Sequence, residues 1–290
     1  MRFSAYAMVF LCFLTTLNIA ARNKVIYGDD NREDINNSNN DFYQELAKST
    51  AIMVHRNKFS FSRSEENYKL QGRTLEQNGM CSEERFSQQL AVGNCSGFLV
   101  GEDLLVTAGH CIKDMDDCQD YYWAFDFVAD NQNQSGRSLF GKDEVYKCKE
   151  IIERSLGRGT SDDYALIRLG RVVKDRSPLE FRKSGKISEG ESIFVIGNPS
   201  GLPTKVANGA YVRSNEKQEF FVTNLDTYGG NSGSAVFNSH GTVEGILVRG
   251  EQDFVMESSR RCLLSNYCTD DGCRGEDVTR ITNIKYLQSL

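Results

Sequence analysis

Short apolar runs separated by polar turns make up most of the chain from residue 88 onward. Each run has the length of a strand and is bounded by Gly, Asn, Asp or Pro, as in GFLVGEDLLVTAG, YALIRLGRVV and SIFVIGN. No comparably long pattern of period 3.6 lies between them. Many short strands with regular turns are typical of β-sandwiches and β-barrels. The pattern therefore predicts an all-β fold.

A polar stretch from Arg171 to Ser177 divides this region about halfway into two barrel-sized pieces. Upstream, residues 46–61 hold a short apolar passage that could add a strand to the first piece. Near the C-terminus, apolar residues recur at helical spacing, at Ile281, Ile284, Leu287 and Leu290. This spacing predicts a short terminal helix.

The first residues have the pattern of a secretory signal. One Arg precedes an apolar run, about Ala5 to Leu17, which is followed by the small residues Ala20 and Ala21. The run is too short to span a membrane comfortably, although an uncleaved anchor is the alternative. We therefore expect residues 1–21 to be a cleaved signal peptide. The protein would be secreted, extracellular or periplasmic, without a stable membrane anchor.

Charge and cysteine content restrict the classes of function. The net charge is -6 and no run is rich in Lys and Arg, so we expect no nucleic-acid partner. Eight cysteines remain after Cys12 in the signal, an even number that indicates disulfides in an exported chain. The spacing of Cys262, Cys268 and Cys273 matches no common zinc signature. We expect neither a metal nor another cofactor.

Ser232 stands between glycines in the stretch LDTYGGNSGSAVF. Such a stretch is typical either of a flexible turn or of a nucleophile surrounded by free backbone amides. A serine hydroxyl is a poor nucleophile unless a base, held in one tautomer by a third group, accepts its proton. The remaining chain has to supply both groups.

His110 is the best candidate for the base among the three histidines. His55 has no distinctive setting, and His240 lies in a predicted hairpin tip facing solvent. His110 ends the apolar run LLVTAGH, and Cys95 and Cys111 flank the two strand-like runs around it. This arrangement predicts a hairpin whose ends meet, so that a Cys95–Cys111 disulfide would clamp the loop that carries His110.

The third group should be a carboxylate at the start of a core strand. Asp162 and Asp163 directly precede the apolar residues of YALIRL. Aspartates before strands are usually turn residues, but one of these would accept a hydrogen bond from Nδ1 of His110. We favour Asp163, which is next to the strand.

The motifs TAGHC, DYALIRL and GGNSGS resemble the three catalytic blocks of trypsin-like serine proteases. Their order, His110, Asp163 and Ser232, is that of the chymotrypsin fold. The GNSGS form is more similar to the V8-like, glutamyl-endopeptidase-type bacterial branch than to digestive trypsins, which have GDSGG. The resemblance covers about residues 88–255.

The resemblance implies two antiparallel β-barrels with the active site in the cleft between them. We expect a propeptide or N-terminal extension at 22–80 and the first barrel at 81–170. The second barrel and the short C-terminal helix would occupy 171–290. Cys118–Cys148 is the expected second disulfide, and the pairing of the other four cysteines stays open.

The implied activity is that of a secreted serine endopeptidase that cleaves protein or peptide substrates through an acyl-enzyme. The backbone N–H groups of Gly230 and Ser232 would form the oxyanion hole. A catalytically inactive binding module on the same fold is the alternative. A serine esterase of the α/β-hydrolase type is disfavoured by the triad order and by the lack of strand–helix alternation. The oligomeric state is left open.

Asn231 departs from the trypsin pattern, which has Asp before the nucleophile. An ion pair between a newly cut N-terminal amine and this position therefore cannot form. Removal of residues 22 to about 80 would have to act by another mechanism, or the oxyanion hole forms without processing.

Candidate substrate-binding residues flank the nucleophile on both sides. Asp226 aligns with the carboxylate that selects Lys or Arg in trypsins, or else it hydrogen-bonds backbone beside Thr227. Leu247 stands where glutamate-specific relatives have His, which weakens a preference for glutamate. The same stretch continues through Val248, Arg249 and Gly250. Arg249 would reach an acidic substrate or face solvent.

Overall fold

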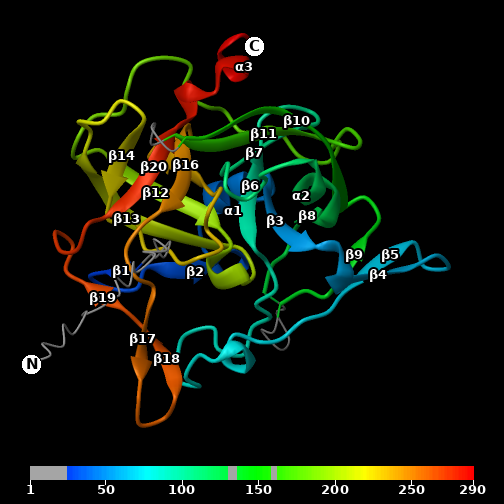
Figure 1. Cartoon of the computed structure of the whole chain (residues 1–290), viewed down its shortest axis with the longest axis horizontal. Coiled ribbons are helices and arrows are strands. Elements are labelled where there is room, and N and C mark those ends of the chain that lie inside the picture. Colours follow the sequence, from blue (N-terminus) through cyan, green and yellow to red (C-terminus); the bar gives the residue numbers. More distant parts are fainter. Residues whose placement is uncertain (1–24, 130–135, 158–161) are drawn as a thin grey trace, which may run out of the picture.

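The computed structural model describes residues 25–129, 136–157 and 162–290, so the expected signal peptide lies outside the described residues. Two closed antiparallel β-barrels make up most of the fold (Figure 1). The predicted all-β class, the two barrels and the short C-terminal helix are confirmed. Among the described residues, no helix is both long and apolar enough to cross a bilayer.

The first barrel closes in the order β10–β11–β7–β6–β3–β8. Its strands are β3 (Thr50–His55), β6 (Cys95–Leu99), β7 (Leu104–Thr107), β8 (Tyr121–Phe125), β10 (Val145–Leu156) and β11 (Asp163–Leu169). Every residue of β6 and β7 is buried. The loop of the second barrel that carries Ser232 packs on Ser96 of β6 and on Thr107 of β7. Continuous apolar runs, rather than alternation, are the sequence signature of such strands.

The second barrel closes through the pairing of β12 with β13. Its strands are β12 (Ser192–Gly197), β13 (Lys205–Ser214), β14 (Phe220–Thr223), β15 (Ala235–Asn238), β16 (Val243–Arg249) and β20 (Glu276–Arg280). A short strand from the N-terminal part of the chain, β2 (Arg32–Asp34), extends this sheet beyond β13. The sheet of the second barrel therefore includes one strand from before residue 171, outside the closed ring.

Smaller elements surround the barrels. The outlying strands are β1 (Ile26–Tyr27) with β19 (Tyr267–Cys268), the hairpin β17 (Phe254–Glu257) and β18 (Cys262–Ser265), and the sheet of β4 (Phe59–Ser62), β5 (Asn67–Leu70) and β9 (Leu139–Gly141). The α-helices are α1 (Asp41–Ala47), α2 (Met115–Asp120) and α3 (Lys285–Gln288). Single 3-10 turns occupy Ile35–Asn37, Arg56–Lys58, Glu76–Asn78, Pro199–Gly201 and Ile281–Asn283.

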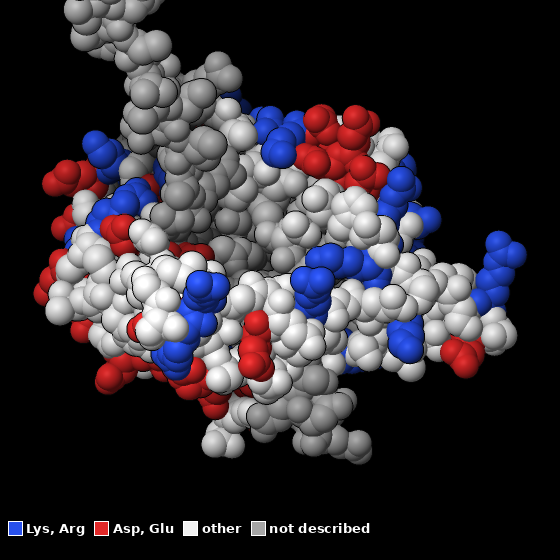
Figure 2. Space-filling model, turned by 60° about the horizontal axis from the view of Figure 1, so that its bottom comes forward, with Lys and Arg blue, Asp and Glu red and all other residues white. Residues whose placement is uncertain are grey.

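The face presented in Figure 2 carries Lys and Arg side chains interspersed with Asp and Glu, and much of its described surface is uncharged.

At the C-terminus, the helical spacing predicted from the sequence is only partly realised. Ile281, Ile284 and Leu287 are fully buried, but Leu290 is 66% exposed. The chain begins this stretch as strand β20, which pairs with β14 and β16, so only the last turn is α-helical.

We had expected the first barrel to begin at residue 81, but it begins earlier in the chain. Strand β3 lies between β6 and β8 and closes the barrel, as the apolar passage at 46–61 suggested. Strand β2 is tied to the second barrel by Lys205, whose buried ammonium contacts Asp34 and Gln89. Burial lowers the pKa of Lys205 to about 8. That residues 22–80 include a cleaved propeptide stays a prediction.

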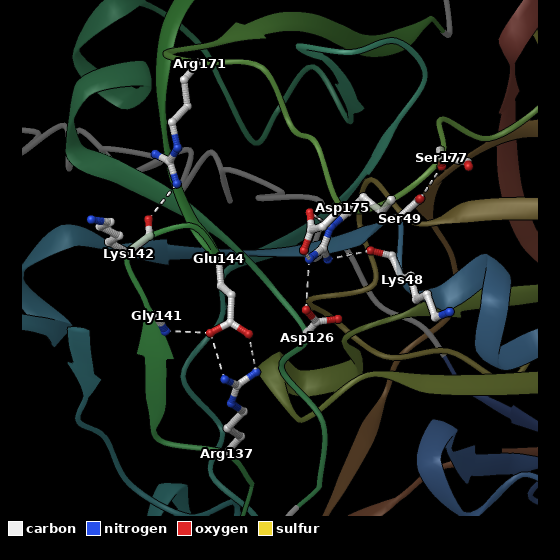
Figure 3. A network of polar contacts seen from close by, with 11 residues as sticks. Lys48, Ser49, Asp126, Arg137, Gly141, Lys142, Glu144, Arg171, Asp175 and Ser177 are labelled. Atoms are coloured by element: carbon white, nitrogen blue, oxygen red, sulfur yellow. Dashed lines mark hydrogen bonds and ion pairs between the residues drawn. The ribbon is translucent and has the colours of Figure 1, made fainter. Parts of the chain in front are cut away.

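The linker between the barrels is fixed along the first barrel by polar contacts (Figure 3). The Arg176 side chain is 2% exposed and donates to the Lys48 carbonyl at 2.7 Å and to Asp126 at 3.0 Å. The Ser49 hydroxyl donates to the Ser177 carbonyl at 2.5 Å. These contacts order the polar stretch that the sequence marked as the division between two pieces.

Four disulfides join the eight described cysteines. Cys95–Cys111 and Cys118–Cys148 are the two pairings expected from the sequence. The remaining pairs are Cys81–Cys262 and Cys268–Cys273. The former connects the segment between β3 and β6 to hairpin β17–β18.

A chain that begins at residue 81 should fail to fold, whereas a chain that begins at residue 25 should fold. Without β3, strands β6 and β8 become open edges and the buried side chains of Ala51 to Val54 are lost from the core. Urea unfolding followed by near-ultraviolet circular dichroism measures the difference. A cooperative transition in the shorter chain would show that β3 is dispensable.

Candidate active site

Asp163 holds His110 at two points. Its Oδ2 lies 2.8 Å from His110 Nδ1, and its Oδ1 accepts the His110 backbone N–H at 3.0 Å. Both side chains are largely buried, with 9% of the His110 side chain and 4% of the Asp163 side chain exposed. An ionised carboxylate can only accept hydrogen bonds, so Nδ1 carries the proton and the lone pair is on Nε2. Ring orientation and tautomer are thereby set by one carboxylate.

The neighbouring Asp162 has a different role. Its Oδ1 accepts a hydrogen bond from Asn283 Nδ2 at 2.6 Å, and burial raises its pKa. The two aspartates diverge because Asp163 is the first residue of β11, where successive side chains point to opposite sides of the sheet.

The side chain of Arg154 in β10 holds the loop that carries His110. The single Nε–H of Arg154 is shared between the carbonyls of Gly109 at 2.8 Å and Ile112 at 2.6 Å. A Cβ at Gly109 would lie 2.1 Å from the Ser155 carbonyl oxygen, so only glycine fits there. The Cys95–Cys111 disulfide closes the loop on its other side.

Ser232 lies in a tight turn that packs against the first barrel. The following residue, Gly233, has φ +90°, and a Cβ there would lie 2.1 Å from the Ser96 carbonyl oxygen and 2.3 Å from Thr107 Oγ1. The Ser232 carbonyl accepts the Ser96 N–H at 2.8 Å and lies 3.7 Å from Cys111 Sγ. These contacts place the Ser232 backbone against the disulfide that adjoins His110.

The two peptide groups before Asn231 are held by their carbonyl oxygens. The Gly229 carbonyl accepts the Ser200 N–H at 2.5 Å, and the Gly230 carbonyl accepts the Ser96 hydroxyl at 2.9 Å. Because C=O and N–H of a trans peptide point in opposite directions, the Gly230 N–H points away from Ser200. Within the described ranges, neither the Gly230 N–H nor the Ser232 N–H has an acceptor.

The Asp226 carboxylate binds the N-terminal segment. Its oxygens accept the N–H groups of Tyr27 at 2.7 Å and Asn31 at 2.8 Å. Burial raises the pKa of Asp226 to about 7, against the lowering effect of these two hydrogen bonds. Of the two roles weighed from the sequence, backbone hydrogen bonding describes Asp226, although the backbone comes from a segment about two hundred residues upstream.

Thr227 and Gly250 converge on a carboxylate that sequence reasoning missed. Glu276 Oε2 accepts the Thr227 hydroxyl at 2.9 Å, and Oε1 accepts the Glu251 N–H at 3.2 Å. A Cβ at Gly250 would lie 1.9 Å from Oε2, so the carboxylate occupies the space that a side chain would take. Glu276 follows a loop rich in Asp and Gly, and no local pattern there indicates a buried acid.

Most side chains of the predicted substrate-binding residues at 247–250 are buried or form ion pairs. Leu247 and Val248 are fully buried, and the Leu247 carbonyl accepts the Gly233 N–H at 2.8 Å. Arg249 pairs with the buried Asp277 at 2.7 Å. The Leu247 backbone therefore supports the loop that carries Ser232, and Arg249 is neutralised within the protein rather than facing solvent alone.

Asn231 is buried and bound within its own loop, where its Oδ1 accepts the Ser234 hydroxyl at 3.3 Å.

Cys95, His110 and Cys111 place potential metal-ligating atoms within 4.8 Å of one another. Both sulfurs belong to the disulfide and cannot act as thiolates, so this cluster does not fit a metal ion.

Replacing Asp226 by Asn should change how stability depends on pH. The pKa of Asp226 is raised on folding, so the folded protein binds a proton that the unfolded chain releases between about pH 4 and 7. This group therefore destabilises the wild type as pH rises, by up to about 1.4 kcal/mol per pH unit in that window. Urea unfolding at pH 5 and pH 8 should show Asp226→Asn gaining stability relative to wild type at the higher pH. An unchanged difference contradicts the assignment.

Comparison with known proteins gives the wider relationship. Exfoliative toxin A of Staphylococcus aureus is 28% identical over 163 residues, which cover 53% of this chain and 55% of the toxin, so the chain spans about half the length of that curated relative. The serine endoprotease of Yersinia pestis has a crystal structure that aligns with a TM-score of 0.46 at 15% identity, over 85% of this chain and 65% of that one. The trypsin-like peptidase domain family matches residues 95–246, more than half of the chain. The chain therefore belongs to the family of trypsin-like peptidase domains.

Proposed function

We propose that this protein is a secreted serine endopeptidase whose catalytic residues are His110, Asp163 and Ser232. The proposal is carried by one observation: the buried Asp163 carboxylate is hydrogen-bonded both to the ring and to the backbone N–H of His110. A histidine in an ordinary surface or core role needs no such double constraint. A general base does, because its lone pair must face one hydroxyl.

The geometry supports the following sequence of bond changes. His110 Nε2 accepts the Ser232 hydroxyl proton while Oγ attacks the substrate carbonyl carbon, and the carbonyl oxygen becomes an oxyanion. The N–H groups of Gly230 and Ser232 donate to that oxyanion. The C–N bond then breaks as His110 returns the proton to the leaving amine. Water repeats the steps on the acyl-enzyme and releases Ser232.

Disulfide content supports secretion. Four disulfides in one chain are typical of oxidising compartments such as the extracellular space or the periplasm.

The substrates would be proteins or peptides, with Thr227 and Gly250 near the side chain that precedes the scissile bond. Asp226 is not assigned to substrate recognition, because both of its oxygens hold the N-terminal segment.

The alternative, an inactive binding module on the same fold, predicts that a catalytic residue is missing or misplaced. All three residues are present, and the paired His110 and Asp163 favour the enzyme. Covalent labelling of Ser232 separates the two hypotheses.

A fluorophosphonate probe should label the wild-type protein, and Ser232→Ala should abolish both labelling and peptide cleavage. Ser239→Ala is the matched control, because it removes an exposed hydroxyl from a turn of the same barrel. Intact mass spectrometry and peptide mapping locate the adduct. A wild-type protein that is neither labelled nor able to cleave a diverse peptide library would rule out the peptidase.

Asp163→Asn should lower kcat by a factor on the order of 10³ to 10⁴, because the amide no longer fixes the His110 tautomer. Asp162→Asn provides the control at the adjacent position and should stay within about threefold of wild type, since Asp162 binds Asn283 instead. Steady-state cleavage of one peptide substrate measures both variants. Equal losses in the two would show that the effect is a general disturbance of the strand start.

A further inference from the structure

The hydroxyl of Ser96 is buried where the two barrels meet. Ser96 is the second residue of β6 and has no exposed surface. Its Oγ donates to the Gly230 carbonyl at 2.9 Å and accepts the Asn198 N–H at 2.9 Å. A serine hydroxyl has one proton, and the shorter contact with Gly230 takes it rather than the 3.4 Å contact with Asn198 Oδ1.

The backbone of the same residue holds the nucleophile. The Ser96 N–H donates to the Ser232 carbonyl at 2.8 Å, and its own carbonyl accepts the Thr107 hydroxyl at 2.7 Å. One residue of the first barrel therefore fixes the carbonyl of the nucleophile and the carbonyl of Gly230.

The Gly229–Gly230 peptide needs such a restraint. Two successive glycines impose little conformational preference, so this peptide can rotate more easily than any other in the loop. A rotated peptide would place the Gly229 carbonyl, an acceptor, where the Gly230 N–H has to donate. The Ser200 N–H holds the Gly229 carbonyl of this peptide, so the Gly230 N–H points away from Ser200. The Ser96 hydroxyl holds the carbonyl of the following peptide, Gly230–Asn231, and so restrains the other side of Gly230.

We propose that Ser96 is a positioning residue whose hydroxyl keeps the oxyanion hole in its working orientation. In this chain the neutral Asn231 cannot form an ion pair with a new N-terminus, and the Ser96 hydroxyl holds the same loop from the other barrel. The hole is then formed in the folded chain without removal of the N-terminal segment, which the fold retains through Asp226. This inference rests on the proposed peptidase function.

The test compares Ser96→Ala with Ser49→Ala. Ser49 is a matched control because its hydroxyl is also buried and donates to a backbone carbonyl, that of Ser177, but within the linker. Removing a whole oxyanion-hole donor costs about 10² to 10³ in kcat. We expect Ser96→Ala to lose roughly ten- to a hundredfold in kcat with KM within about threefold, and Ser49→Ala to keep wild-type kcat.

A peptide aldehyde, which forms a tetrahedral adduct with a serine nucleophile, gives a second readout. The affinity of the aldehyde should fall in parallel with kcat/KM for Ser96→Ala and stay unchanged for Ser49→Ala. A general loss of stability would instead affect the two variants alike. A folded Ser96→Ala protein with wild-type kcat overturns the inference. If Ser96→Ala does not fold, Ser96→Gly removes the hydroxyl without adding volume, and wild-type kcat there overturns it equally. Failure of the peptidase hypothesis looks different: the wild type itself then shows neither cleavage nor labelling.

Discussion

The close approach of the Gly233 backbone to strands β6 and β7 is the contact on which the site depends. No side chain fits between Gly233 and the backbone and hydroxyl groups of Ser96 and Thr107. The second barrel can therefore bring Ser232 against the disulfide that adjoins His110, although the two residues come from different barrels. A methyl group at this point would push the barrels apart, because the groups it meets belong to paired strands that cannot yield separately.

The N-terminal segment is the second element that joins the barrels. It adds β2 to the second barrel and β3 to the first, and before β2 its backbone N–H groups bind Asp226 near the loop that carries Ser232. A continuous segment of the chain thus connects the residues before Ser232 with both barrels. The buried Arg32 strengthens the connection, because it pairs with Asp30 and lies over the Tyr228 ring.

Much of the fold and the His110–Asp163 pair could be predicted from sequence because their signals are local. Strand-length apolar runs mark the barrels, and Asp163 is distinguished from Asp162 by its position directly before a strand. The Cys95–Cys111 pairing follows from one hairpin. Ser96 and Glu276 could not be found in this way, since no local pattern marks either residue and the contacts with Gly230 and Thr227 join positions 134 and 49 residues apart. Asp226 shows the same limit: which donor reaches its carboxylate depends on the path of the N-terminal segment, which the polar sequence around it does not indicate.

The Cys81–Cys262 disulfide makes the consequence of a broken backbone depend on where the break falls. A cut at any peptide bond between these two residues leaves one covalent molecule, because the ends remain linked through the cystine until a thiol reduces it. A cut between residues 25 and 80 has no such link, since every described disulfide begins at residue 81 or later. The strands β2 and β3 would then be retained only by hydrogen bonds and packing. A single cut before Cys81 can therefore separate the N-terminal segment with β2 and β3, and one after Cys273 can separate the end of the chain with β20, whereas a cut between Cys81 and Cys262 separates nothing.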